Sequence, residues 1–160
     1  MINKIIGILE KDCKKTPEAI ANELNVDLKT VKDTIKDLED KGIIAGYKAL
    51  INWDKFDKDL VVAQIELRVT PQIGKGFDRI AEKIYQFEQV KSMYLMSGGY
   101  DLSLTIIGRN MKDVALFVAE KLAPMECVES TTTHFILKKY KENGEIFEQD
   151  DTDNRQVISL

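Results

Sequence analysis

The chain has 160 residues, of which 44% are hydrophobic and 31% charged, and its formal net charge is −4. A length of this order suits one ordinary domain or two small ones. No apolar run approaches the ~20 residues of a membrane span, and the N-terminus lacks the apolar stretch of a signal peptide, so we expect a cytoplasmic protein with no membrane partner. The two cysteines, Cys13 and Cys127, form no CxxC pair, which favours free and mostly buried thiols.

The negative charge is concentrated at the C-terminal end. From Lys141 onward there are two basic and six acidic residues, so residues 1–140 are electrically balanced. Overall charge therefore does not indicate nucleic-acid binding, which would have to depend on a local basic patch. We interpret residues 141–160 as an acidic tail that is mobile in its middle. Its last residues, 155–160, have the composition of a short strand.

The first half of the chain shows the spacing of three short helices. Thr16 is the expected N-cap of the second helix, Asp27 the expected N-cap of the third, and Gly42 the residue that ends the third. A three-residue turn between the second and third helices is typical of a helix-turn-helix. A β-ribbon, or wing, is expected to follow, and then a polar linker. The expected ranges are 2–12, 16–24 and 28–41 for the helices, 43–52 for the wing, 1–50 for the whole domain and 51–59 for the linker.

The second half alternates between β-rich and amphipathic segments. The order β-α-β-β-α-β is that of a ferredoxin-like unit, so the fold class we expect is α+β, with this unit after the helix-turn-helix. Helices on one face of its sheet leave the other face uncovered, which favours pairing with a second copy. The expected domain is 60–140, with strands at 60–70, 90–97, 100–108 and 127–140 and helices at 74–87 and 111–123.

The third helix carries a candidate DNA-binding face. Lys29, Lys32 and Lys36 lie on one side of it, next to the apolar stripe. The first residues of a recognition helix usually meet base edges, so Lys29, Thr30 and Asp33 are the candidate base readers. Lys32 and Lys36 are the candidate phosphate contacts. The helix has no arginine, and therefore lacks the strongest bidentate contact to guanine.

The same residues also fit a solvated helix face. Asp33 is spaced to pair with Lys36, and Asp37 with Lys41, within the helix. In that case the lysines would not bind DNA.

Residues with catalytic spacing are not found. The sequence "SGGYDL" lacks the spacing and the lysine of a phosphate-binding loop. His134 is the single histidine and falls within an expected strand, and no histidines or cysteines have metal-ligand spacing. We therefore expect no catalytic residue, no metal and no cofactor.

The stretch "SGGYD" between two expected strands has two interpretations. Gly98 and Gly99 suit a two-residue hairpin turn with positive φ. Alternatively, glycines let a ligand approach the backbone, whose free amides can receive a carboxylate. Asp101, next to Tyr100, could then accept from an ammonium group, so a small amino-acid-like ligand would match this loop.

Taken together, the N-terminal "IIGILEKDCKKTPEAIANELNVDLKTVKDTIKDLEDKGIIAGYKALIN", the "SGGYDL" element and the final "TTTHFILKKYK" resemble the Lrp/AsnC (feast/famine) family of transcription regulators. The resemblance runs from about residue 3 to residue 141. It implies a winged helix-turn-helix that binds double-stranded DNA, followed by a ferredoxin-like domain that forms homodimers and often octamers. It also implies an amino acid or related metabolite bound between subunits. The residues it places around that effector are Thr70, Pro71, Gly98, Gly99, Tyr100, Asp101, Thr131, Thr132 and Thr133. Gly99 stands where the family often has an aspartate.

Two other functions stay open on the sequence. Siroheme decarboxylases resemble this family and depend on basic and histidine side chains, for which His134 would be the only histidine. A metabolite sensor that does not bind DNA would leave the lysines of the third helix merely solvated. The leading expectation is a DNA-binding regulator that responds to a small amino-acid-like effector.

Overall fold

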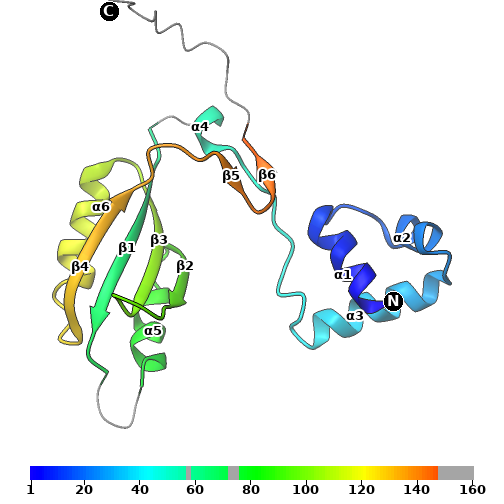
Figure 1. Cartoon of the computed structure of the whole chain (residues 1–160), viewed down its shortest axis with the longest axis horizontal. Coiled ribbons are helices and arrows are strands. Elements are labelled where there is room, and N and C mark those ends of the chain that lie inside the picture. Colours follow the sequence, from blue (N-terminus) through cyan, green and yellow to red (C-terminus); the bar gives the residue numbers. More distant parts are fainter. Residues whose placement is uncertain (57–58, 72–75, 148–160) are drawn as a thin grey trace, which may run out of the picture. The chain divides into compact units, whose positions relative to one another are not determined.

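A computed structural model describes residues 1–56, 59–71 and 76–147 of the chain. The chain folds into two compact units, one at Met1–Ile51 and the other from Asn52 onward. Figure 1 gives the element labels used below. Each unit has a hydrophobic core of its own, and each is described by itself.

The first unit consists of three helices, α1 (Ile2–Lys11), α2 (Pro17–Leu24) and α3 (Leu28–Asp40). They pack around a small apolar core in which Ile5, Ile20 and Val31 are fully buried. The connection between α2 and α3 is three residues long and is possible because Asn25 adopts a left-handed conformation. The predicted helix-turn-helix is confirmed, with helix ends within one residue of those expected.

Both ends of α3 are fixed by local hydrogen bonds. At its start, the Asp27 carboxylate accepts from the Thr30 backbone N–H at 3.1 Å. At its end, Gly42 has φ +67°, the Gly42 N–H donates to the Glu39 carbonyl at 2.9 Å, and the Ile43 N–H donates to the Leu38 carbonyl at 2.9 Å. This pair of bonds is a Schellman motif, in which glycine adopts the left-handed conformation without a Cβ penalty. The predicted N-cap and the predicted terminating glycine are both confirmed.

The β-ribbon predicted at 43–52 is wrong. Residues 41–52 are all described, and none of them forms a strand. Ile44 packs on the helical core. After it, the segment is exposed and does not pair with a second strand. A two-stranded ribbon is marginal in water even when both strands are present. Tyr47 fixes the segment to α3 instead, because its hydroxyl donates to the Glu39 carboxylate at 2.8 Å. Partial burial and this bond raise the pKa of Tyr47.

The expected polar linker contains a short helix, α4 (Trp53–Phe56), in which the Trp53 and Phe56 rings meet edge to face with centroids 6.0 Å apart. This pairing of two aromatic rings gives the segment local order that its polar composition did not suggest.

The second unit is built on a four-stranded antiparallel sheet with the strand order β2-β3-β1-β4. Helices α5 and α6 pack on one face of it (Figure 1). This arrangement confirms the predicted ferredoxin-like architecture. The elements are β1 (Val61–Val69), α5 (Asp78–Tyr85), β2 (Val90–Leu95), β3 (Leu102–Gly108), α6 (Met111–Phe117), the π-helical turn η1 (Val118–Leu122) and β4 (Val128–Phe135).

Side chains alternate across the central strand β1. Ala63, Ile65 and Leu67 are fully buried against the helices. Gln64, Glu66 and Arg68 point to the other face, opposite α5 and α6. The sheet therefore has one apolar face in the core and one polar face, as an antiparallel sheet often does.

Three boundaries in this unit differ most from those expected. The helix predicted from 74 begins at Asp78, and residues 72–75 are outside the described part of the chain. The strand predicted to reach 140 ends at Phe135, because β1 begins at Val61 and gives no backbone partner beyond the bond from the Ile136 N–H to the Val62 carbonyl. The helix predicted at 111–123 widens into η1, where the Ala123 N–H donates to the Val118 carbonyl five residues back.

The segment predicted as an acidic tail that is mobile in its middle begins with a hairpin that was not predicted. Strands β5 (Lys141–Glu142) and β6 (Glu145–Ile146) are joined by Asn143 and Gly144, which both have positive φ. An Asn-Gly pair is favoured in this turn because both positions require that conformation. The strand suggested at 155–160 and the mobile middle of the tail lie outside the described residues.

The cap of α3 can be tested by substitution. Asp27→Ala removes the acceptor for the Thr30 N–H, and we expect the free energy of unfolding of the first unit to fall by about 1 kcal/mol. Urea denaturation followed by helical circular dichroism measures this change. Asp33→Ala, an exposed position on the same helix, is the control and should change stability much less. Equal losses in the two variants would contradict the capping role.

Candidate functional site

The predicted DNA-binding residues lie on the outer side of α3. Lys29, Asp33 and Lys36 are exposed, and within the described residues none of the three forms an ion pair. Thr30 is half-buried; its backbone N–H is held by the cap, and its carbonyl accepts from the Thr34 hydroxyl at 2.7 Å. The structure therefore brings these side chains to one exposed surface, with Thr30 at its edge.

The pairing expected of a purely solvated helix face forms only in part. Asp37 and Lys41 pair at 2.7 Å between Oδ2 and Nζ. No such bond joins Asp33 to Lys36 in the part of the chain that the structure describes. Within the described residues, the aspartates of α3 therefore pair with none of its three lysines, Lys29, Lys32 and Lys36.

Lys32 has a partner that the spacing within α3 did not indicate. Its Nζ lies 2.9 Å from Oε1 of Glu18, which is in the first turn of α2. The hydrogen bond from Lys32 is the main reason that the pKa of Glu18 is lowered. The contact joins residues 14 positions apart, so only the packing of α2 on α3 creates it.

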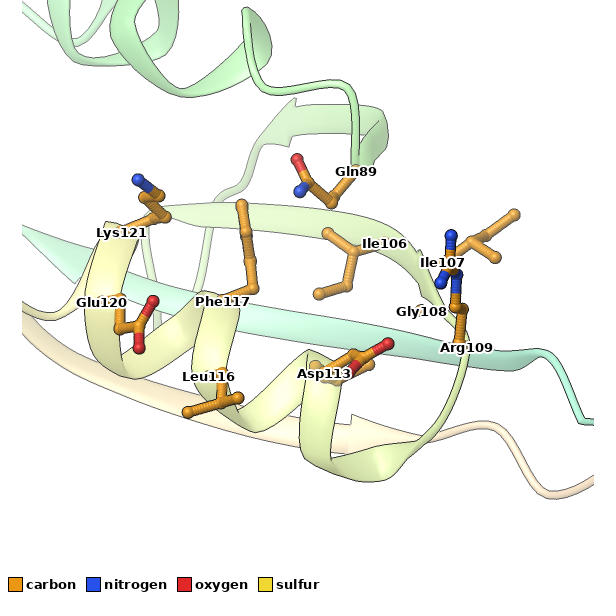
Figure 2. A pocket seen from close by; sticks show the side chains of 11 residues that line it. Gln89, Ile106, Ile107, Gly108, Arg109, Asp113, Leu116, Phe117, Glu120 and Lys121 are labelled. Carbon is orange, nitrogen blue, oxygen red and sulfur yellow. The ribbon is translucent and has the colours of Figure 1, made fainter.

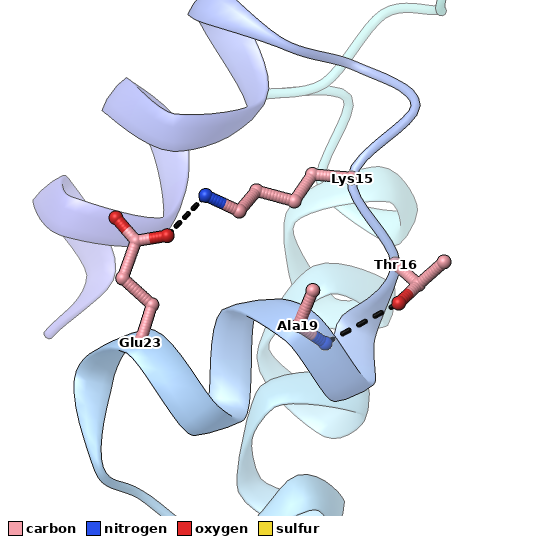
Figure 3. Close-up of polar contacts among 4 residues, drawn as sticks. All are labelled: Lys15, Thr16, Ala19 and Glu23. Carbon is pink, nitrogen blue, oxygen red and sulfur yellow. Dashed lines mark hydrogen bonds and ion pairs between the residues drawn. The ribbon is translucent and has the colours of Figure 1, made fainter.

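Other polar contacts fix the start of α2 (Figure 3). The Thr16 hydroxyl accepts from the Ala19 N–H at 3.2 Å, which confirms the predicted N-cap. Lys15 pairs with Glu23 at the other end of the same helix. Cys13, which precedes this turn, is exposed, so the expectation of a buried thiol is wrong there; Cys127 is half-buried.

The "SGGYD" loop is a hairpin connection of four residues, 97–100, closed by the bond from the Met96 N–H to the Asp101 carbonyl at 2.8 Å. Gly98 has φ +143°, whereas Gly99 does not have positive φ. The predicted two-residue turn at Gly98 and Gly99 is therefore wrong. The loop is longer because it is attached to β1 as well as to its own two strands.

Asp101 makes most of that attachment. Its backbone N–H donates to the Leu67 carbonyl at 2.9 Å, and its Oδ2 accepts from the Val69 N–H at 2.9 Å. The carboxylate thus continues the β1–β3 ladder where the backbone of β3 turns away. Arg68 adds a third bond, from its Nε to the Gly99 carbonyl at 2.8 Å. Arg68 was not among the predicted site residues, and its place in a polar-alternating strand gave no sign of this contact.

Only some of the remaining predicted effector residues lie close to Asp101. The Thr70 N–H donates to the Cys127 carbonyl at 2.9 Å and the Thr70 hydroxyl bonds to Glu129, so Thr70 and the adjacent Pro71 lie at the same end of the sheet as Asp101. The threonines of β4 are split between faces. Thr131 and Thr133 are paired with Leu67 and Ile65 on the helix side, while Thr132 is paired with Glu66 on the open side.

Two cavities in this unit are lined by other residues. One of about 380 Å³ is at the opposite end of β3, against α6 and η1 (Figure 2). A second of about 370 Å³ is between α5 and the segment before β4. Neither contains any of the nine predicted effector residues. The first is lined by Gln89, Ile106, Arg109, Asp113, Phe117 and Lys121, among others, and the second by Arg79, Lys83 and Cys127, among others.

His134 lies on the open sheet face, where its Nε2 is 3.4 Å from Oε1 of Glu66. No group of three or more metal-ligating side chains occurs among the described residues. In the same residues, no helix is long and apolar enough to cross a membrane.

The structural role of Asp101 gives a direct prediction. Asp101→Ala leaves the buried Val69 N–H without an acceptor, and we expect a loss of about 1–3 kcal/mol of stability. Asp101→Asn keeps an oxygen that can accept this bond, so it should cost much less. Urea unfolding of the full chain followed by fluorescence measures both. A loss from Asn as large as that from Ala would show that the negative charge, not the hydrogen bond, holds the loop.

Family comparisons match both units of the chain. The profile described as the Lrp/AsnC ligand binding domain matches residues 62–146, and the profile described as winged helix-turn-helix DNA-binding matches residues 2–45. The first match spans the sheet, both of its helices and the C-terminal hairpin. The second spans the three helices and ends just after the Schellman motif.

Individual proteins give the same result. The chain is 48% identical over 157 residues to YugG of Bacillus subtilis, an uncharacterized HTH-type transcriptional regulator, covering 98% of this chain and 95% of the relative. It is 34% identical over 138 residues to the HTH-type transcriptional regulator LrpA of Pyrococcus horikoshii, covering 86% and 94%. Its fold is similar to that of a Neisseria meningitidis transcriptional regulator solved in complex with L-Met, with a TM-score of 0.72 at 22% identity over 88% and 90% of the two chains. From these matches, together with a helix-turn-helix followed by a ferredoxin-like sheet, we conclude that the chain belongs to the Lrp/AsnC family of transcriptional regulators.

Proposed function

We propose that this regulator binds double-stranded DNA through the outer face of α3. The observation that carries the proposal is that Lys29 and Lys36 are exposed on a helix whose two ends are fixed, with no ion pair to either within the described residues. In a helix-turn-helix the second helix of the motif enters the major groove, and its first residues meet the bases. The relatives are regulators rather than enzymes, which supports this function over the decarboxylase alternative.

Each side chain on this face has a role that suits its chemistry. Lys36, further along α3, is proposed to contact a phosphate, as is Lys32 once its bond to Glu18 is exchanged. Lys29 and Thr30, in the first turn, are proposed to reach base edges. Asp33 can accept a hydrogen bond from the amino group of cytosine. Phosphate contacts of this kind supply affinity, while the contacts of the first turn supply sequence preference.

We also propose that the second unit binds an amino acid or a related small metabolite at the "SGGYD" end of the sheet. Asp101 uses Oδ2 for the Val69 N–H, so Oδ1 is the atom proposed to accept from an ammonium group. Arg68, which already reaches the Gly99 carbonyl, supplies a cation for a carboxylate. Tyr100 and Thr70 lie beside these charges, and the similar fold from Neisseria meningitidis was solved with L-Met.

The assembly we propose is a homodimer that associates further into an octamer. It is supported by the polar sheet face of the second unit, which lies opposite the face that α5 and α6 cover and which displays Glu66, Arg68 and His134. A site at the sheet end, with its threonines on two faces, is incomplete within one chain and would be completed by a neighbouring subunit. Effector binding would then favour one assembly over another and so change how the DNA-reading helices are presented. The corresponding division of the chain is 1–50 for DNA and 60–140 for ligand and assembly, with a linker at 51–59 and an acidic segment at 141–160.

The DNA interface is tested by charge removal. We expect Lys36→Gln to weaken binding across all sequences and to reduce the slope of log K against log salt by about 0.9 between about 50 and 200 mM, because one phosphate contact is lost. We expect Lys29→Gln to change the sequences recovered from a random duplex library. Electrophoretic mobility shifts over a salt series measure the first effect, and selection followed by sequencing measures the second. Lys41→Gln, whose lysine is paired with Asp37 outside this face, is the control. An unchanged slope in Lys36→Gln together with unchanged selection in Lys29→Gln would refute the interface.

The effector site is tested by ligand-induced stabilisation. An amino acid that binds the folded chain raises the melting temperature, by the equivalent of about 2.7 kcal/mol when it is present at about 100 times its Kd. We expect Asp101→Asn to abolish this shift, because it keeps an acceptor for Val69 but removes the charge. Asp113→Asn removes a carboxylate from the cavity at α6 and is the control. A shift lost in Asp113→Asn and kept in Asp101→Asn would move the site to that cavity.

A further inference from the structure

Glu18 and Lys32 form an ion pair across the two helices of the helix-turn-helix. Their Oε1 and Nζ atoms are 2.9 Å apart, and the side chains are 55% and 53% exposed. Glu18 is in the first turn of α2, and Lys32 is on the second turn of α3. The pair therefore lies at the surface, and its lysine is part of the candidate DNA-binding face of α3.

Glu18 is held in its ionised form at this place. It is next to the N-terminus of α2, where the helix dipole favours a negative charge. The hydrogen bond from Lys32 is the first reason that its pKa is lowered, and hydrogen bonding to backbone at the helix start adds to it. The carboxylate is thus a fixed negative charge beside a surface that would have to meet phosphates.

A carboxylate and a phosphodiester oxygen are alternative partners for the same ammonium group. Both are anionic oxygen acceptors, and a lysine binds either one as a compact point charge. An exposed ion pair is weak because water and salt screen it, so exchanging one partner for the other costs little. Glu18 would also lie close to the phosphate that takes its place, and like charges repel there.

We propose that Glu18 is an affinity-setting residue of the DNA interface, which holds Lys32 in an intramolecular pair that a DNA phosphate must displace. This inference rests on the proposed binding of DNA by α3. It predicts that the wild-type chain binds DNA less tightly than its three lysines would allow. The structure assigns the same kind of partner to neither Lys29 nor Lys36 within the described residues, so the effect is specific to Lys32.

The test measures binding of the full chain to a random-sequence DNA duplex by fluorescence anisotropy over a salt series. Glu18→Gln should bind about 3- to 10-fold more tightly at the low end of the salt range, because Lys32 no longer has to leave an intramolecular partner and no carboxylate repels the phosphate. Glu10→Gln removes the same charge from an exposed position on α1, so it controls for net charge. Melting curves of all variants report whether the fold is kept.

The double variant separates direct competition from a general charge effect. In a Lys32→Gln background, Glu18→Gln should change the affinity no more than Glu10→Gln does. Equal tightening with and without Lys32, or no tightening in Glu18→Gln alone, would overturn the inference. If Lys29→Gln and Lys36→Gln weaken binding while Glu18→Gln does nothing, only this inference fails. If none of the lysine variants alters binding, the proposed DNA interface fails with it.

Discussion

Strand β1 is the element on which the rest of the second unit depends. It is paired on both edges, with β3 on one side and β4 on the other, and its alternate side chains reach the two faces of the sheet. Ile65 and Leu67 are fully buried, so a shift of one residue in register would turn them toward solvent. The register that burial imposes on β1 also places the Leu67 carbonyl and the Val69 N–H where Asp101 can bind both. The register of this one strand thus sets both which side chains enter the core and where the candidate effector loop is held.

Asp101 completes the β1–β3 ladder and is also proposed to accept the ammonium group of the effector. With both roles, it would couple the position of the loop to ligand binding. Arg68 reinforces this coupling, since its bond to the Gly99 carbonyl joins the polar face of the sheet to the same loop. A ligand that engaged either group would therefore act on β1, the strand that carries both the core and the open sheet face.

The charge of the first unit bears on the assembly proposed for the second. In the first, the lysines of α3 lie among exposed aspartates and one glutamate from α2, so the surface proposed to bind DNA is only weakly basic. An interface of this kind gains much of its affinity from having two or more copies in one assembly, each adding phosphate contacts. This links the modest charge of each helix to the oligomer proposed for the second unit.

Local sequence was sufficient to predict α1, α2, α3, α5 and α6, the order of these helices and of β1 to β4 along the chain, and the family, but not α4 or the β5–β6 hairpin. Thr16, Asp27 and Gly42 act through hydrogen bonds to residues within four positions, and apolar periodicity depends only on nearest turns, so both can be read locally. The β-ribbon at 43–52 and the two-residue turn were predicted wrongly, because a ribbon needs a second strand and the loop is held by β1, about 30 residues earlier in the chain. Packing between elements established that Asp101 binds Val69, that Glu18 holds Lys32, and that the threonines of β4 divide between two faces. Each of these contacts depends on which elements pack against each other. Sequence spacing alone does not indicate such contacts, because the residues are far apart along the chain.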